Sequence, residues 1–230
     1  MLQIKGLNVQ RGSGVQAHRV QLPELSLTRG QVVAITGESG CGKSTLLEAL
    51  GLLLAPESVA HYCLDGMDIA ALLKADDQPA LADVRARSLG FVLQSGGLLP
   101  FLNARDNINL PRRLLGLASK SDHVERAIAA LHLETLLDQF PQALSIGERQ
   151  RVACVRAIAH QPRLILADEP TAALDPHNAR QLFELLLGLV AELGLSALIV
   201  SHDWQLVNSF GITRLNAVSL PGVTRFETSL

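Results

Sequence analysis

The segment GESGCGKST, residues 37–45, is the feature that most constrains what this chain can fold into. It fits every fixed position of the pattern G-x-x-x-x-G-K-[ST]. Residues 31–36 precede it and predict a short buried strand, and residues 44–54 predict a helix. Glycines let successive backbone N–H groups turn toward one anion, and a helix N-terminus adds partial positive charge. The segment therefore predicts a phosphate-binding loop between a strand and a helix.

Two residues of this loop carry specific chemistry. Lys43 would reach the β- and γ-phosphates of a nucleotide, and the Ser44 hydroxyl would be a ligand of Mg²⁺. The alternative is a Gly- and Ser-rich turn that binds nothing. We expect nucleotide contacts along the whole loop, which consists of Gly37, Glu38, Ser39, Gly40, Cys41, Gly42, Lys43, Ser44 and Thr45.

Composition excludes several other classes of protein. Of the 230 residues, 48% are hydrophobic and 18% are charged, which indicates a folded globule. The net charge of −2 shows no excess of basic residues that could bind a phosphate backbone, so we expect no nucleic acid partner. Three cysteines without a CxxC pair predict neither a disulfide framework nor a zinc site. Cys41, inside the loop, is either a redox-sensitive thiol or a small filler residue.

The chain carries no membrane-spanning signal of its own. Its N-terminal segment lacks the basic and apolar regions of a signal peptide, and no apolar run approaches the roughly 18 residues that span a bilayer. We expect a cytosolic protein whose membrane role, if it has one, comes through a partner.

Apolar patterns predict an α/β fold in a single domain, residues 1–230. Strand-like alternation around a turn at Gly12–Gly14 predicts an antiparallel start, and short apolar strands that alternate with helices predict a mostly parallel sheet. The expected parts are an N-terminal antiparallel β subdomain, residues 1–30, a core with the phosphate loop, residues 31–94 and 161–230, and an inserted α-helical lobe, residues 95–160.

The same patterns place individual elements. Apolar runs predict strands at residues 61–64, 90–93, 163–167 and 197–200. An apolar spacing near 3.6 predicts helices at residues 106–115, 121–131, 148–160 and 179–193. Pro111 is expected to interrupt the first of these helices.

Two acidic residues follow the predicted strand in the segment RLILADEP. Ligands of open parallel sheets bind at the carboxyl ends of strands, where Asp168 can hold the Mg²⁺ shell. The adjacent Glu169 fits the base or water-orienting group that phosphate hydrolysis requires. The alternative is a pair of acids that only begin a helix.

Another apolar strand leads to His202, at the same predicted edge of the sheet. A neutral imidazole there can donate one hydrogen bond to a γ-phosphate and accept another, although a lone His is usually structural. Asp175, ahead of the long helix, could simply be its cap.

The segment LSIGERQ begins another predicted helix. Ser145 and Glu148 form the S-x-x-E pattern of a capping box. Free N–H groups, a hydroxyl and the small Gly147 at a positive helix end also make a second anion site. A chain with two separate phosphate-binding ends can close around nucleotide by pairing with a second copy.

These motifs together resemble the ATP-binding subunit of ABC transporters, over about residues 2–205. The set includes Gln94 after the strand GFVL, ALD at residues 173–175 and SHD at residues 201–203. The resemblance implies a P-loop NTPase fold and a head-to-tail pair of subunits that sandwiches two ATP. It also implies integral membrane permease subunits as partners. It assigns Ser145 and Gly147 to the partner's γ-phosphate.

The resemblance also implies roles for four further residues. It places Gln94 in the region of Mg²⁺ and the attacking water, and it makes Glu169 the general base. It implies that His202 senses the γ-phosphate and that Asp175 contacts the other subunit. We expect the two subunits to be identical, which makes the pair a homodimer.

The chain departs from the family at two places. Ile146 and Glu148 stand where the family's signature usually has glycine and glutamine. Because a β-branched residue does not easily take φ > 0, we expect an altered start of this helix. The family also has an adenine-stacking aromatic near residue 11, which this chain lacks, and our hypothesis is that the Arg11 guanidinium stacks on adenine instead.

The segment after Gln94 is similar to the lipoprotein-releasing and macrolide-exporter branch. Its apolar cluster, residues 98–101, predicts a groove that receives a short helix of a membrane partner, and the same residues could instead pack the helical lobe. The expected function is an ATPase on the cytoplasmic face of the cell (inner) membrane. It would drive a separate permease of export or membrane-extraction type.

Two alternatives remain open. One is a soluble ABC ATPase without a transport role, acting in cofactor assembly or as a regulatory module. The other is a degenerate ATP-binding subunit, which Ile146 and the missing aromatic favour. The presence of Gln94, Glu169 and His202 opposes that second alternative.

Overall fold

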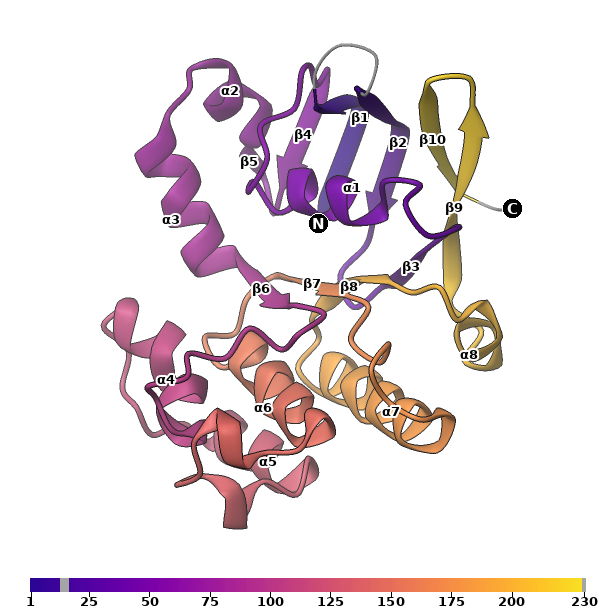
Figure 1. The fold of residues 1–230 in the computed structure, drawn as a ribbon. Coiled ribbons are helices and arrows are strands. Elements are labelled where there is room, and N and C mark those ends of the chain that lie inside the picture. Colours follow the sequence, from indigo (N-terminus) through magenta and orange to yellow (C-terminus); the bar gives the residue numbers. More distant parts are fainter. Residues whose placement is uncertain (13–16, 229–230) are drawn as a thin grey trace. The chain divides into compact units, whose positions relative to one another are not determined.

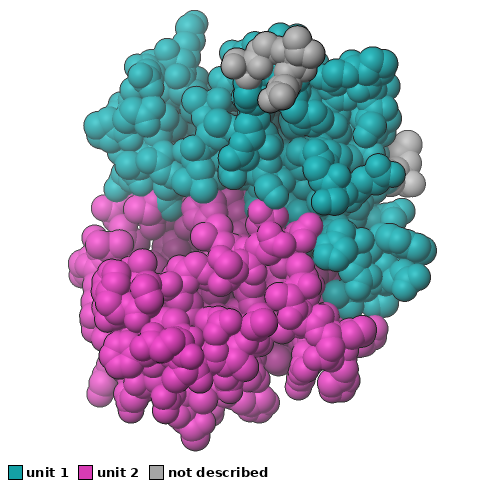
Figure 2. Space-filling view, viewed as in Figure 1, with its two compact units in different colours: residues 1–85, 196–230 teal, residues 86–195 magenta. Residues whose placement is uncertain are grey.

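The computed structural model describes residues 1–12 and 17–228, which form two compact units (Figure 2). Unit 1 consists of Met1–Arg85 and Ser196–Leu230, and unit 2 of Ala86–Leu195. The turn predicted at Gly12–Gly14 falls in part on residues 13 and 14, which lie outside the described residues. Unit 2 is thus inserted, along the chain, between the two segments of unit 1.

Unit 1 is built on a sheet that combines antiparallel and parallel strands (Figure 1). Its strands are β1 (Leu2–Arg11), β2 (His18–Leu27), β3 (Val32–Thr36), β4 (His61–Leu64), β5 (Met67–Asp68), β8 (Ser196–Val200), β9 (Thr213–Leu220) and β10 (Val223–Thr228). β1 pairs antiparallel with β2 and β4. β3 pairs parallel with β8 and β9, and β10 joins the two groups through β2 and β9.

The burial pattern of β1 explains why this segment is a strand. Leu2 and Ile4 are fully buried on one face, and Leu7 and Val9 continue the buried row after a shift of phase. The shift falls at Gly6, which has a φ of +62°. Glycine adopts this left-handed conformation without the steric cost that other residues carry, so the strand continues through the change of face.

Helix α1 (Lys43–Leu50) follows β3 and ends four residues before the predicted position, so that part of the prediction is wrong. Gly51 caps the helix, and Leu52 has a left-handed φ of +59°, which no α-helix can contain. The fully buried Tyr62 donates its hydroxyl to the Leu50 carbonyl at 2.5 Å, and burial raises the pKa of this phenol. The end of α1 is therefore fixed by a side chain of β4.

Unit 2 contains a parallel strand pair and a set of helices. The elements are β6 (Leu89–Val92), α4 (Ala104–Leu114), α5 (Asp122–Ala130), α6 (Ile146–Ile158), β7 (Leu164–Asp168) and α7 (Pro176–Glu192), with short 3-10 turns at Glu134–Leu136 and Pro141–Ala143. β6 and β7 pair in parallel. Parallel core strands, antiparallel N-terminal strands and helices between β6 and β7 confirm the predicted α/β fold class.

Among the described residues, three helices and three strands were not predicted from the sequence: α2 (Ile69–Lys74), α3 (Gln78–Ser88), α8 (Trp204–Ser209), β5, β9 and β10. In α3 only Leu81 and Val84 are buried, so the segment carries almost no apolar spacing. This helix contains the boundary between the two units.

Pro111 does not interrupt α4, so this prediction is wrong. Proline removes one helical N–H and its bond to the carbonyl four residues earlier, that of Asn107. The side chain of Asn107 is wholly buried and donates to three carbonyl oxygens of the preceding segment, while its own oxygen accepts from the Leu99 N–H at 2.8 Å. These hydrogen bonds fix the first half of α4, so the helix continues although Pro111 cannot donate to the Asn107 carbonyl.

The C-terminal end of α6 is held by two neighbouring helices. The Ala159 carbonyl accepts hydrogen bonds from Arg112 Nη1 and from His123 Nε2, each at 2.8 Å. Burial lowers the pKa of His123, which favours the neutral ring, with its proton on the nitrogen that faces the carbonyl. Because the free carbonyls of a helix end need donors, α4 and α5 fix this end of α6.

We expect Tyr62→Phe to lower the free energy of unfolding by roughly 1–3 kcal/mol, because the buried Leu50 carbonyl loses its donor while the ring packing is kept. Urea titration followed by circular dichroism measures this change. Ser219→Ala, which removes an exposed hydroxyl of β9, is the control and is expected to change stability by less than about 0.5 kcal/mol. Equal stability of the two variants would contradict the assigned role of the phenol.

Candidate nucleotide-binding site

The phosphate loop lies in unit 1, between the end of β3 and the start of α1. Gly42 caps α1 with a left-handed φ of +98°. A Cβ at this position would lie 2.6 Å from Val20 Cγ2 and 3.2 Å from His18 Nε2. Backbone conformation and space therefore both require glycine immediately before Lys43.

Lys43 is buried, with 5% of its surface exposed, and its ammonium group is held by the loop itself. Nζ donates to the carbonyl oxygen of Gly37 at 3.0 Å and to that of Glu38 at 2.7 Å. The loop thus wraps around a positive charge. A phosphate bound to the loop N–H groups would meet that charge at close range and compete with the two carbonyls for it.

His18 is a site residue that the sequence did not reveal. Its Nε2 lies 3.3 Å from the Cys41 carbonyl oxygen and 3.3 Å from Thr224 Oγ1, so the ring supports the loop from β2 and β10. No local pattern marks this residue, because its contacts depend on strand pairing and on a loop far along the chain. The same pairing places it opposite Arg11.

Arg11 is directed toward the helix that starts at the phosphate loop. Its Nη1 lies 3.0 Å from Glu48 Oε2 on α1, and both side chains are partly exposed. A guanidinium oriented by a carboxylate presents a planar cationic face. The geometry is compatible with the stacking hypothesis.

His202 follows β8, which lies in unit 1 with the loop. β8 and β3 pair in parallel, with Val200 opposite Ile35, so the two strands end at the same edge. His202 and the phosphate loop therefore leave the sheet at one edge. The next residue, Asp203, caps α8 by accepting from the Leu206 N–H at 2.8 Å.

In unit 2, the ends of β6 and β7 bring two predicted site residues together. Val92 lies opposite Ala167 in the parallel pair, and Gln94 and Glu169 each follow their strand by two residues or fewer. Gln94 Nε2 donates to Glu169 Oε2 at 3.4 Å. Asp168 is the last residue of β7, beside this pair.

Glu169 adopts a left-handed backbone conformation, with a φ of +45°. This region costs a residue with a side chain about 1 kcal/mol or more, and such strain collects at functional sites. The turn that follows is closed by the Ala172 N–H, which donates to the Glu169 carbonyl at 3.1 Å. The backbone therefore holds the carboxylate in a direction that an ordinary strand end would not give it.

The predicted capping box at the start of α6 is confirmed. Glu148 N–H donates to Ser145 Oγ at 3.3 Å, and Ser145 N–H donates to Glu148 Oε2 at 2.7 Å. Hydrogen bonds from the backbone and side chain of Ser145 lower the pKa of Glu148. Glutamic acid therefore performs the capping role here, and as an anion.

The altered helix start expected from Ile146 is wrong. Ile146 is the first residue of α6 and is absent from the described residues with positive φ. The position needs only ordinary helical dihedrals, which a β-branched residue adopts. Its side chain is 47% exposed, next to Ser145 and Gly147.

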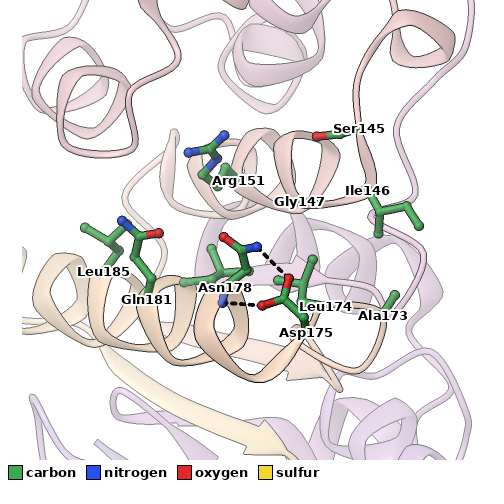
Figure 3. A pocket seen from close by; sticks show the side chains of 11 residues that line it. Ser145, Ile146, Gly147, Arg151, Ala173, Leu174, Asp175, Asn178, Gln181 and Leu185 are labelled. Carbon is green, nitrogen blue, oxygen red and sulfur yellow. Dashed lines mark hydrogen bonds between the residues drawn. The ribbon is translucent and has the colours of Figure 1, made fainter.

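A hollow of about 490 Å³ separates the N-terminal parts of α6 and α7 (Figure 3). Ser145, Gly147 and Asp175 all line it, so the structure brings these three predicted residues together. Asp175 also caps α7, accepting from the backbone N–H groups of His177 and Asn178, each at 3.2 Å. Hydrogen bonds from the side chain and backbone of Asn178 lower the pKa of Asp175.

Each unit thus holds one group of the predicted site residues. Unit 1 contains Arg11, the phosphate loop and His202, and unit 2 contains Gln94, Ser145, Gly147, Asp168, Glu169 and Asp175. Over residues 1–12 and 17–228, no helix is long and apolar enough to cross a membrane.

Comparison with known proteins identifies the family. The family model described as ABC transporter matches residues 20–172. The lipoprotein-releasing system ATP-binding protein LolD of Ruegeria sp. (strain TM1040) is 44% identical over 185 residues, which are 80% of this chain and 79% of that protein. The methionine import ATP-binding protein MetN of Chromohalobacter salexigens is 38% identical over 213 residues, 91% of this chain and 59% of that protein.

Solved structures agree with the sequence comparison. A dimeric post-hydrolysis state of the ATP-binding cassette MJ0796, bound to ADP and Pi, superposes with a TM-score of 0.83 at 30% identity and covers 99% of this chain and 98% of that chain. This chain therefore combines similarity to these relatives with a phosphate loop, carboxylates at a strand end and the capped helix α6. This chain belongs to the ABC transporter family, as an ATP-binding subunit.

Proposed function

We propose that this subunit hydrolyses ATP to power a membrane permease that extracts lipid-anchored substrates, and that it works as a pair of identical copies. The observation that carries hydrolysis is the Gln94–Glu169 side-chain pair at the ends of β6 and β7. Similarity to LolD, named a lipoprotein-releasing ATP-binding protein, over 80% of this chain supports the extraction type. The subunit would act at the cytoplasmic face of the membrane.

The phosphate loop would bind the triphosphate. Backbone N–H groups of residues 37–45 and the N-terminus of α1 provide donors, and the buried Lys43 provides charge. His18 keeps the loop in place from behind. Lys43 would exchange its carbonyl acceptors for phosphate oxygens, so its charge neutralises the phosphates.

The chain offers hard oxygen donors of the kind that Mg²⁺ prefers. Ser44 on the loop would contribute a hydroxyl, Asp168 at the end of β7 a carboxylate, and Gln94 an amide oxygen. These donor types fit the ion. When bound, Mg²⁺ neutralises charge on the β- and γ-phosphates.

Hydrolysis requires a water molecule in line with the γ-phosphorus. Glu169 would accept a hydrogen bond from this water and then its proton, while the Gln94 amide donates to the Oε2 atom of the same carboxylate. His202 would donate to a γ-phosphate oxygen from the β8 edge. The left-handed backbone at Glu169 would fix the direction of this carboxylate.

A second copy would complete each site. Ser145 and Gly147 at the capped start of α6 present a hydroxyl and N–H groups to an anion, and Asp175 lies in the same hollow (Figure 3). The related cassette MJ0796 forms a dimer in its solved structures. Ser145 of one copy would contact the γ-phosphate bound by the other.

The permease contact would include the apolar segment after Gln94. Phe101 is 71% exposed, an unusual state for so large an apolar side chain. The segment 98–101 leads directly from the Gln94 loop into α4. A short helix of a membrane partner could cover it.

We expect Glu169→Gln to bind ATP, to trap a dimer and to lose roughly 10²–10⁴-fold in kcat, because the amide cannot accept the proton. ATPase assays and size-exclusion chromatography with ATP measure these effects. Lys43→Ala is expected to weaken ATP binding itself by about tenfold or more. Glu184→Gln, an exposed carboxylate of α7, is the matched control, and normal turnover by Glu169→Gln would remove this residue from its role.

We expect Arg11→Ala to weaken ATP binding by roughly three- to fivefold, as the loss of one exposed cation–π stack predicts. Binding of inorganic triphosphate, which has no base, should be unchanged. Arg19→Ala, on the neighbouring strand, is the control. Unchanged ATP affinity in Arg11→Ala would discard the stacking hypothesis.

Transport is tested by co-purification from native membranes and reconstitution of the permease with this subunit. We expect ATP-dependent release of a lipid-anchored protein from proteoliposomes, lost in Glu169→Gln and in a Phe101→Asp variant that still hydrolyses ATP alone. Failure to recover any permease would favour a soluble ATPase without a transport role.

A further inference from the structure

The loop that carries Gln94 turns its carbonyl groups toward helix α6. The chain after β6 passes through Gly96 and Gly97, which have left-handed φ values of +75° and +57°. The left-handed φ of Gly97 favours glycine there, and a Cβ would also lie 2.8 Å from Leu93 Cδ1. Carbonyls that face inward at such a turn need donors from the packed side.

Arg156 of α6 supplies two of these donors. Its Nη1 donates to the Gly97 carbonyl at 2.7 Å and its Nη2 to the Gly96 carbonyl at 2.8 Å. Burial lowers the pKa of this guanidinium, so its charge is kept here at an energetic cost. A planar fork that binds two successive carbonyls fixes both the position and the orientation of the turn.

Gln150, also on α6, supplies the third donor. Its side chain is 2% exposed, and Nε2 donates to the main-chain carbonyl of Gln94. Its Oε1 has no hydrogen-bond partner among the described residues. A buried amide with an unpaired oxygen is less favourable for stability than a leucine of similar size. The hydrogen bond to the Gln94 carbonyl is an interaction of this amide that a leucine could not make.

We propose that Gln150 and Arg156 are positioning residues for hydrolysis, which set the Gln94 amide against Glu169 through the backbone of the Gln94 loop. The proposal rests on the role of Gln94 and Glu169 in the proposed function. Neither residue touches the reacting atoms. Their contacts lie within unit 2, as does the 3.4 Å contact between Gln94 and Glu169 that they support.

Helix α6 connects these contacts to Ser145, where the proposed second phosphate site lies. The helix starts at the capped Ser145, where we place the partner's phosphate, and reaches Arg156 eleven residues on, about 16 Å away at 1.5 Å per residue. The capped Ser145 and the donors that hold the Gln94 loop thus belong to one helix. The apolar segment 98–101 follows that loop directly. Gln150 and Arg156 therefore hold the loop from which both the Gln94 side chain and the segment of the proposed permease contact extend.

A double-mutant cycle tests the proposal with the full chain. Gln94→Ala removes the side-chain amide but keeps the main-chain carbonyl that Gln150 binds, and Gln150→Leu removes the donor at similar volume. We expect Gln150→Leu to lower kcat about tenfold with KM for ATP changed less than about twofold, and to have almost no effect in the Gln94→Ala background. Gln142→Leu, at an exposed glutamine of unit 2, is the matched control.

Arg156→Lys provides a second, independent variant, because lysine keeps the charge but cannot bind both carbonyls as a fork. We expect a smaller loss of kcat that also disappears in the Gln94→Ala background. This cycle carries the test if Gln150→Leu fails to fold.

The outcomes separate the proposal from the function on which it rests. Losses in kcat that multiply independently of Gln94, or unchanged turnover in both α6 variants, would overturn the positioning role. Full activity of Gln94→Ala itself would instead overturn the proposed role of Gln94, and the positioning role with it.

Discussion

Backbone carbonyl groups left without partners by tight turns are the constraint on which both parts of the site depend. A tight turn leaves main-chain carbonyl groups without partners in its own backbone, and these groups need donors from side chains or water. In unit 1 the ammonium of Lys43 binds two such oxygens, and in unit 2 the guanidinium of Arg156 binds two others. Long cationic side chains thus provide donors for the carbonyl groups of both tight turns.

The parts that could be predicted from the sequence depend on near neighbours. The phosphate loop lies between a strand and a helix because its glycines and Lys43 are consecutive, and the capping box of Ser145 depends on a residue three positions away. Gln94 was assigned through the family resemblance, and its contact with Glu169 arises because two parallel strands end at one edge. Local pattern therefore predicted the fold class and the phosphate loop, and the family resemblance added roles for further candidate site residues.

The parts that could not be predicted depend on contacts between distant segments. Gln150 and Arg156 reach a loop 56 to 60 residues away, and His18 supports a loop 23 residues away, so no periodicity marks any of them. Helix α3 has too few buried residues to produce an apolar pattern. The error at Ile146 had another origin: a positive φ was assumed for the family's glycine, whereas this position is helical.

The backbone at Glu169 has a consequence for protein engineering. Its φ of +45° lies where glycine and asparagine are the residues with the least strain. A library of this chain that is screened only for heat resistance would therefore tend to enrich glycine or asparagine at this position and to discard the carboxylate. Asp168, one residue earlier, ends an ordinary strand and offers no such gain. Two adjacent acids would then respond differently to the same screen, because of their backbone dihedrals and not their charge.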